Sequence, residues 1–328
     1  MKITERDIKT WSSIGTRATF GIAALELAKA NEDLIVLTSD VSTSAGLDRF
    51  RKTLPNQYID VGIAEQNMMG IAAGLASEGF KIITTTFTPF QTARCCEQIK
   101  INLGYMKNKV CMVGLASGLA LGTLGYSHCS IEDIGMLRSI PNLNIISPAD
   151  GLETVKSLQA AIISKNSCYI RLTGTSNNKI IYNSDYDFKI GKSVKLKDGN
   201  DITIFCNGAI IAECLKASEL FEEKGFSCKV INMHTIKPVD EEAIENSLSS
   251  KLIITVEEHN IIGGLSSAVS ETKSKFSKSP PQIVFGVNDK YSKAGEYEYL
   301  KIKHGLNAEN IVITALKKLI PNEQQRNL

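Results

Sequence analysis

Runs of apolar, mostly β-branched residues alternate with longer amphipathic segments along the chain. Four runs predict buried strands: DLIVLTSD (33–40), KIITTTF (81–87), KVCMVGLA (109–116) and NLNIISPAD (142–150). Helical apolar spacing occurs in four segments, 17–30, 65–78, 89–104 and 150–164. Strands that alternate with helices of about 10–15 residues predict a doubly wound α/β domain, with a mostly parallel sheet covered on both faces.

The pattern changes after residue 174 and then resumes. Residues 175–200 are polar and lack a helical period, so we expect a linker with one or two hairpins. A second alternation follows, with a strand at 201–208 and an amphipathic helix that Gly225 closes. Further strands are expected at 228–234, 251–259 and 281–287. The sequence therefore predicts two α/β domains, residues 1–185 and 186–328.

Composition narrows the class of protein. The 328 residues are 43% hydrophobic and 22% charged with a net charge of +2, so no electrostatic feature favours nucleic acid or an anionic membrane as partner. No segment has the apolar length of a secretory signal or a membrane span. The eight cysteines form no C-x-x-C pair and do not cluster with histidines at zinc-like spacing. We expect free thiols, no metal ligands and a cytoplasmic protein.

The segment DVGIAEQNMMG (60–70) places Glu65 between a short apolar run and an alanine-rich helical pattern. A glutamate in the first turn of a helix is stabilised by the helix dipole, so Glu65 has an ordinary structural explanation. However, the carboxyl ends of parallel strands face the ligand crevice, which is where catalytic groups gather. The residues alone leave both interpretations open.

The segments 60–68 (DVGIAEQNM), 84–99 (TTTFTPFQTARCCEQI), 125–142 (GYSHCSIEDIGMLRSIPN) and 146–150 (ISPAD) resemble the pyrimidine-binding domain of transketolase. They are also similar to 1-deoxyxylulose-5-phosphate synthase, and most closely to the separately encoded C-terminal subunits of split transketolases. The later INMHTIKPVD and TVEEHNIIGGLSSAVSE resemble the C-terminal domain of the same enzymes. The likeness covers about residues 10–320 and implies a thiamine diphosphate pyrimidine-binding fold followed by a transketolase C-terminal-like domain.

This resemblance implies roles for residues near the cofactor. The family acid that matches Glu65 hydrogen-bonds N1′ of the aminopyrimidine and relays a proton during activation of thiamine diphosphate. Phe90 matches the ring that stacks on the aminopyrimidine and Phe87 the wall beside it, although two apolar residues three apart are commonly core. The positions that match residues lining the thiazolium are Ile63, Asp40 and Val41.

The resemblance also implies substrate contacts. His128 matches a histidine that hydrogen-bonds donor hydroxyls and assists proton transfer. Arg17, Ser44 and Arg171 match positions that bind the sugar phosphate tail, where a planar guanidinium suits phosphate oxygens. Two solvated arginines are the structural alternative.

Two departures from the family pattern affect substrate selection. Residues 116–125 lack the histidine and the acidic pair of the family's H-D-S-x-G-x-G-E-D-G loop, so the usual sugar phosphate donors are in doubt. Ala93 stands where many transketolases have tyrosine, which predicts a wider pocket.

The G-D-G motif that binds Mg²⁺ and the diphosphate in this family is absent. The resemblance therefore implies that a separate N-terminal subunit supplies the Mg²⁺ and diphosphate site in an α2β2 heterotetramer, which transfers two-carbon ketol units between sugar substrates. Two enzyme alternatives are the β subunit of a 2-oxo acid dehydrogenase first component and a 1-deoxyxylulose-5-phosphate synthase-like enzyme. A non-catalytic binding protein that keeps the fold is a third alternative.

Overall fold

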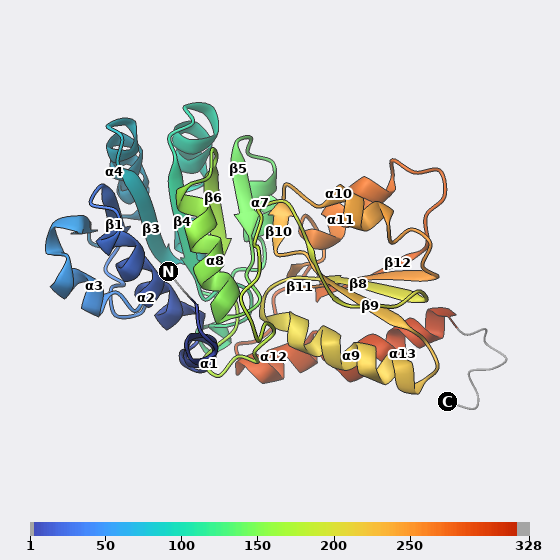
Figure 1. Cartoon of the computed structure of the whole chain (residues 1–328). Coiled ribbons are helices and arrows are strands. Elements are labelled where there is room, and N and C mark those ends of the chain that lie inside the picture. The colour runs from blue at the N-terminus through green and yellow to red at the C-terminus, as the bar shows by residue number, and fades with distance from the viewer. Residues whose placement is uncertain (1–2, 320–328) are drawn as a thin grey trace.

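The computed structural model of the chain describes residues 3–319, and within this range the strands form two sheets that lie side by side (Figure 1). The first sheet has seven strands in the order β10-β5-β6-β4-β3-β1-β2, and the second has five in the order β12-β11-β8-β9-β7. Within this range the pairs β10–β5 and β7–β9 are antiparallel, and all other neighbouring strands are parallel. The prediction of two mostly parallel α/β sheets is confirmed.

The strands of the first sheet are β1 (Leu34–Thr38), β2 (Tyr58–Asp60), β3 (Lys81–Phe87), β4 (Val110–Leu115), β5 (Leu143–Ile146), β6 (Ser167–Arg171) and β10 (Thr235–Lys237). Those of the second are β7 (Val194–Lys197), β8 (Ile202–Cys206), β9 (Cys228–Asn232), β11 (Leu252–Asn260) and β12 (Gln282–Val287). The central strands are almost entirely buried, as expected for apolar runs covered on both faces.

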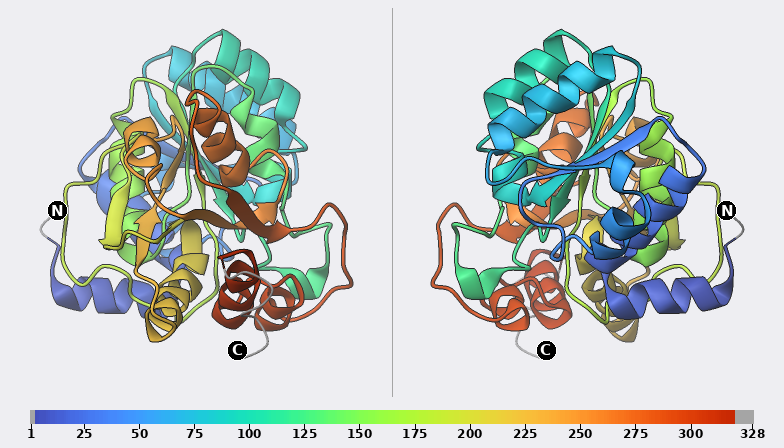
Figure 2. Two further views of the ribbon diagram at one scale, coloured as in Figure 1. Left: turned by 90° about the vertical axis from the view of Figure 1, so that its right-hand side faces the viewer. Right: turned by 90° about the vertical axis from the view of Figure 1, so that its left-hand side faces the viewer.

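Helices cover both faces of each sheet (Figure 2). One side of the first sheet carries α1 (Glu5–Ile14), α2 (Thr16–Lys29), α3 (Asp48–Thr53) and α8 (Gly151–Ile162). The other carries α4 (Glu65–Ser77), α6 (Cys96–Gln98), the π-helical η2 (Ile99–Tyr105) and α7 (Asp133–Arg138). The second sheet packs against α9 (Ile211–Glu223) and α13 (Ala308–Leu319) on one side and α10 (Glu241–Glu245) and α11 (Leu265–Lys273) on the other. The remaining helical elements are η1 (Pro55–Gln57), α5 (Thr88–Gln91), η3 (Gly122–Leu124), η4 (Gly208–Ile210) and α12 (Tyr297–Lys303).

Strand β1 shows why an uninterrupted apolar run suits this position. Leu34 and Val36 join the core cluster under α2 and α8, whereas Ile35 and Leu37 join the cluster under α4. Successive side chains of a strand point to opposite faces, so a strand covered on both sides needs apolar residues at every position.

Two predicted elements differ in the structure. The helix expected over 89–104 is interrupted: α5 ends at Gln91, the chain turns at 92–95, and α6 and η2 follow. The hairpins expected within 175–200 are absent from this described segment. Its strand β7 pairs instead with β9, and backbone N–H groups of Ile181 and Tyr182 donate to Asp150, which holds the linker against the first domain.

The structure also bears on the predicted helix cap, the domain boundary, the cysteines and membrane-spanning helices. Gly225 follows α9 with φ of +80°, so its predicted capping position is confirmed. The domain boundary at residues 185 and 186 stays a prediction, and the outer ends of both ranges, residues 1–2 and 320–328, lie outside the described residues. All eight cysteines fall within residues 3–319 and are free of disulfides, as predicted. Over the same range, none of the helices combines the length and apolar character that a bilayer span needs.

Candidate active site

The carboxyl ends of β1, β2, β3 and β4 lie in register at one edge of the first sheet. Asp60, the last residue of β2, accepts hydrogen bonds at Oδ1 from the backbone N–H of Asp40 and of Gly62, both at 3.0 Å. This carboxylate thus ties the turn after β1 to the turn before α4. Sequence reasoning did not assign Asp60 a role, although an acid that ends a parallel strand was the available signal.

Glu65 is the first residue of α4 and is only 4% exposed. One of its oxygens, Oε1, accepts a hydrogen bond from Nη1 of Arg94 at 2.9 Å. The other oxygen, Oε2, has no hydrogen-bond partner among the described residues. A shielded carboxylate with one free oxygen at the crevice edge can hold or pass on a proton for a bound nitrogen base.

Three rings form a cluster beside this acid. The ring centroids of Phe87 and Phe90 are 6.5 Å apart, and that of His128 lies 6.0 Å from Phe87 and 5.4 Å from Phe90, all edge to face. Such edge-to-face pairs are favourable arrangements of aromatic rings. The structure therefore brings together three predicted site residues from the end of β3 and from the loop after β4.

Arg94 connects the acid to the aromatic cluster. Its guanidinium carbon lies 4.0 Å from the centroid of the Phe90 ring, within the range of a cation–π contact. The interruption of the expected 89–104 helix lets Arg94 reach Glu65 across 29 positions of sequence. Nothing in the residue pattern distinguished this arginine from its exposed neighbours, so sequence reasoning missed it.

His128 is half-buried, and its Nδ1 lies 3.0 Å from the hydroxyl of Ser127. Its loop is joined to the turn after β4 by the backbone pair of Gly118 and Ser130. Ser117, in the loop over residues 116–125, is buried and shares a 2.6 Å hydrogen bond with Thr88. That hydroxyl is therefore engaged inside the fold and does not face a substrate.

Arg17 and Ser44 line one hollow of about 240 Å³, together with Ile14, Ala18, Thr43 and Gly46. Among the described residues no carboxylate pairs with Arg17, so its guanidinium is available to an anion. The structure thus places two of the three predicted phosphate-binding residues next to one another.

The residues expected near the thiazolium lie at the same edge but are incompletely enclosed. Asp40 is exposed in a left-handed conformation with φ of +56°, and Val41 is half-buried. Ile63 is 77% exposed, although we expected it to line the thiazolium. A large apolar side chain next to a buried carboxylate is therefore left without a cover in the single chain.

Arg171 does not join this group, because it is 0% exposed at the end of β6. Its Nε donates to Oδ2 of Asp133 at 2.7 Å, and its Nη2 donates to the backbone carbonyl oxygens of Ser130 and Glu258. Its Nη1 has no hydrogen-bond partner among the described residues, but the whole side chain is enclosed and cannot reach a phosphate in the surrounding crevice. The position of Arg171 therefore supports a structural role and not the expected contact with substrate.

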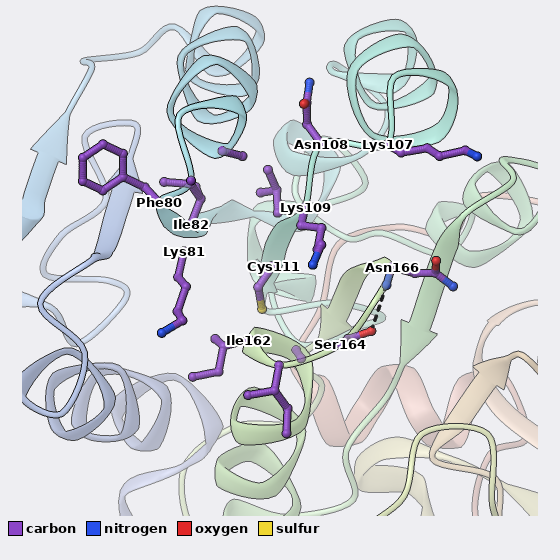
Figure 3. Close-up of a pocket in the computed structure, with 15 residues that line it drawn as sticks. Phe80, Lys81, Ile82, Lys107, Asn108, Lys109, Cys111, Ile162, Ser164 and Asn166 are labelled. Carbon is purple, nitrogen blue, oxygen red and sulfur yellow. Dashed lines mark hydrogen bonds between the residues drawn. The ribbon is translucent and has the colours of Figure 1, made fainter.

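A cavity of about 440 Å³ lies at the opposite ends of the strands (Figure 3). It is lined by the start of β3 and β4 and by the end of α8, and it contains none of the predicted site residues. Lys81, one of its lysines, is paired with Asp33 at 3.2 Å. Since ligands of parallel sheets bind at the carboxyl ends of the strands, the edge of the sheet that carries Glu65 is the better candidate for the active site.

The described residues hold no group of three or more histidine, cysteine, aspartate or glutamate side chains that could bind a metal ion. The described residues thus offer an acid, a cluster of edge-to-face rings and, in Arg17, an arginine without a carboxylate partner. A carboxylate-rich cation site is not among them.

Comparison with known proteins assigns most of the chain to one family. Residues 12–178 match the family described as "Transketolase, pyrimidine binding domain", and residues 191–311 match "Transketolase, C-terminal domain". The chain is 37% identical over 306 residues to an apulose-4-phosphate transketolase subunit of Phocaeicola vulgatus, a match that covers 93% of this chain and 97% of that protein.

Two further relatives locate the chain within the family. It is 34% identical to human transketolase over 267 residues, which are 80% of this chain but 42% of the human protein. A solved structure described as "Split gene transketolase, inactive beta4 tetramer" matches with a TM-score of 0.84 and 34% identity, over 93% of this chain and 98% of the other. With both domains in the family order, the chain belongs to the transketolase family.

Proposed function

We propose that the chain is the pyrimidine-binding subunit of a two-chain, thiamine diphosphate-dependent transketolase that transfers a two-carbon ketol unit between sugar or sugar phosphate substrates. The observation that carries this proposal is the placement of Glu65, Phe90, Phe87 and His128 at one strand edge, with the acid shielded and one of its oxygens free. A shielded acid beside flat rings suits a planar nitrogen base.

The residues fit one half of the cofactor. Glu65 would hold the aminopyrimidine through its N1′ nitrogen, Phe90 would stack on that ring, and Phe87 would form the adjacent wall. When bound, thiamine diphosphate supplies the reactive carbon that carries the two-carbon unit. Glu65 would share a proton with N1′, and His128 would donate or accept a proton at a substrate hydroxyl. Ile63, Asp40 and Val41 would border the second ring of the cofactor.

The other half of the cofactor site would come from a partner chain. The described residues offer no cluster for Mg²⁺, which prefers carboxylate and carbonyl oxygens, and the human relative is more than twice as long as its matching part. The 77% exposure of Ile63 marks an apolar surface that a partner would cover. We therefore propose a separate diphosphate-binding subunit that holds Mg²⁺, in an α2β2 assembly. The neighbour described as an inactive beta4 tetramer agrees with inactivity of this subunit type alone.

Arg17 and Ser44 would bind the phosphate end of a sugar substrate, since their shared hollow presents an unpaired guanidinium and a hydroxyl. The loop over residues 116–125 would not contribute the usual hydrogen bonds to donor hydroxyls, because it lacks the family's histidine and acidic residues. We therefore propose sugar phosphates as the substrate class, with a donor that differs from the common ketose phosphates.

The test is the Glu65→Gln variant in a complex reconstituted with the diphosphate-binding chain, Mg²⁺ and thiamine diphosphate. Loss of a proton-sharing acid should lower kcat by about 10²–10⁴-fold. Glu78→Gln, at the exposed C-terminal end of the same helix, is the matched control and should keep full turnover. The chain on its own should bind no thiamine diphosphate in calorimetry. Unchanged turnover of the Glu65→Gln complex, or full activity of the isolated chain, would reject the proposal. Turnover of 2-oxo acids in place of ketose phosphates would favour the dehydrogenase alternative.

A further inference from the structure

The Arg94 guanidinium makes two contacts at once in the free chain. One N–H group donates to Oε1 of Glu65 at 2.9 Å, and the guanidinium carbon lies 4.0 Å from the centroid of the Phe90 ring. The planar group therefore lies against the aromatic ring while it is bonded to the acid. This arrangement explains how a carboxylate that is 4% exposed remains paired when nothing else is bound.

These two contacts are the ones proposed above for the cofactor. A protonated aminopyrimidine is, like guanidinium, a planar conjugated cation with N–H donors, and in the proposed site it would bond Glu65 and stack on Phe90. A base that bonds Glu65 and stacks on Phe90 where the guanidinium now lies must displace Arg94, even though the second oxygen of Glu65, Oε2, is free in the unloaded chain. We infer that Arg94 is an internal substitute for the aminopyrimidine, which occupies its position in the unloaded subunit and must withdraw when the cofactor binds. This inference rests on the proposed function, because it takes the cofactor site from there.

The structure provides a way for Arg94 to withdraw without unfolding. Its side chain is 43% exposed, so rotation about its own bonds can carry the guanidinium into solvent. Its backbone is fixed, since the carbonyl accepts a hydrogen bond from Nε2 of Gln66 at 2.9 Å and the N–H donates to the carbonyl of Pro89 at 3.1 Å. Only the side chain therefore needs to move. The competition lowers the apparent affinity for the cofactor by the fraction of subunits with an open site.

The test compares Arg94→Met with wild type in the reconstituted complex, with calorimetric titration of thiamine diphosphate in the presence of Mg²⁺. Methionine keeps the length of the side chain but removes the charge and the hydrogen bond. A half-exposed ion pair together with a cation–π contact should reduce cofactor affinity by about tenfold, so Arg94→Met should bind thiamine diphosphate about tenfold more tightly. Stopped-flow mixing should also show faster association. Arg6→Met, on the exposed side of α1, is the matched control and should change neither quantity.

A second comparison tests whether the effect acts through the acid. In a Glu65→Gln background the ion pair is gone and the cation–π contact with Phe90 remains, so a further Arg94→Met change should give a clearly smaller gain in affinity than in the wild-type background. Weaker or unchanged binding by the single Arg94→Met variant would overturn the inference, and so would an equal gain in both backgrounds. These outcomes leave the proposed function intact if Glu65→Gln alone abolishes turnover. If Glu65→Gln keeps full turnover, the proposed function fails whatever Arg94→Met does.

Discussion

The buried ion pair of Arg171 and Asp133 provides a direct test of the assignment of Arg171 as a structural residue. Both side chains are 0% exposed, and Nε of Arg171 lies 2.7 Å from Oδ2 of Asp133. Tyr169 donates its hydroxyl to the same oxygen at 2.7 Å, and burial with the negative charge of Asp133 nearby raises the pKa of that hydroxyl well above its ordinary value. Nη2 of Arg171 also donates to the backbone carbonyl of Glu258 at 2.6 Å, so the pair links the two domains.

Removing one partner from such a pair leaves an uncompensated charge inside the protein. Arg171→Met should therefore lower the free energy of unfolding by about 3–5 kcal/mol, and Asp133→Asn by a similar amount. The double variant should lose less than the sum of the two single losses, because neither charge is then left alone. Arg51→Met removes the exposed pair with Asp48 and should cost at most about 1 kcal/mol, which makes it the control.

Urea unfolding followed by circular dichroism at about pH 7 measures all four variants. Folded Arg171→Met in the reconstituted complex should keep the wild-type KM for a phosphorylated substrate. A loss of less than about 1 kcal/mol for Arg171→Met, combined with a raised KM for the phosphorylated substrate alone, would refute the structural interpretation. The phosphate contact expected from the sequence would then be right.

Two further predictions concern pH and phosphate. Burial lowers the pKa of His234 to about 4, below its ordinary value of 6.5, so the stability linked to its neutral form is present above pH 6.5 and is lost as pH falls toward about 4. Urea unfolding at about pH 7 and at about pH 4.5 should show that the free energy of unfolding falls by nearly 3 kcal/mol, and this loss should be smaller in His234→Gln. An equal loss in that variant would exclude His234 as the cause. Arg17→Met should raise KM for a phosphorylated sugar by about 10–100-fold and leave KM for the unphosphorylated sugar unchanged. An equal rise for both sugars would show that Arg17 does not contact phosphate.

Local patterns in the sequence were sufficient for eight of the twelve described strands and for the helices α2, α4, α8 and α9, whereas the short strands β2, β6, β7 and β10 were not predicted. Uninterrupted apolar runs such as 33–40 and 109–116 predicted buried strands because both of their faces must be covered, and the structure places β1 and β4 there. The position of Glu65 at a helix start directly after a strand also follows from adjacent residues alone. The segment 89–104 was the exception, since its apolar spacing suits a helix but the chain turns at 92–95.

Contacts between distant segments were decided by tertiary structure. The strand β10 lies in the sequence between β9 and β11, two strands of the second sheet. It nevertheless pairs with β5 and extends the first sheet. Arg94 meets Glu65 only because β2 and β3 end at the same edge of the sheet, with β1 between them. Arg171 resembles a crevice arginine in sequence, but it is enclosed by Asp133 and by the backbone of the second domain.

The sequence by itself determined the α/β alternation, the two-part organisation and the acid at the start of α4. These features depend on the order of apolar and polar residues within a few turns or strands, and such short-range order can be read directly from the chain. The tertiary structure decided that Arg94 reaches Glu65 and that Arg171 is buried. It also placed Arg17 beside Ser44, without a carboxylate partner among the described residues. These positions depend on strand order, loop paths and the packing of the two domains, and residue spacing does not encode these long-range distances.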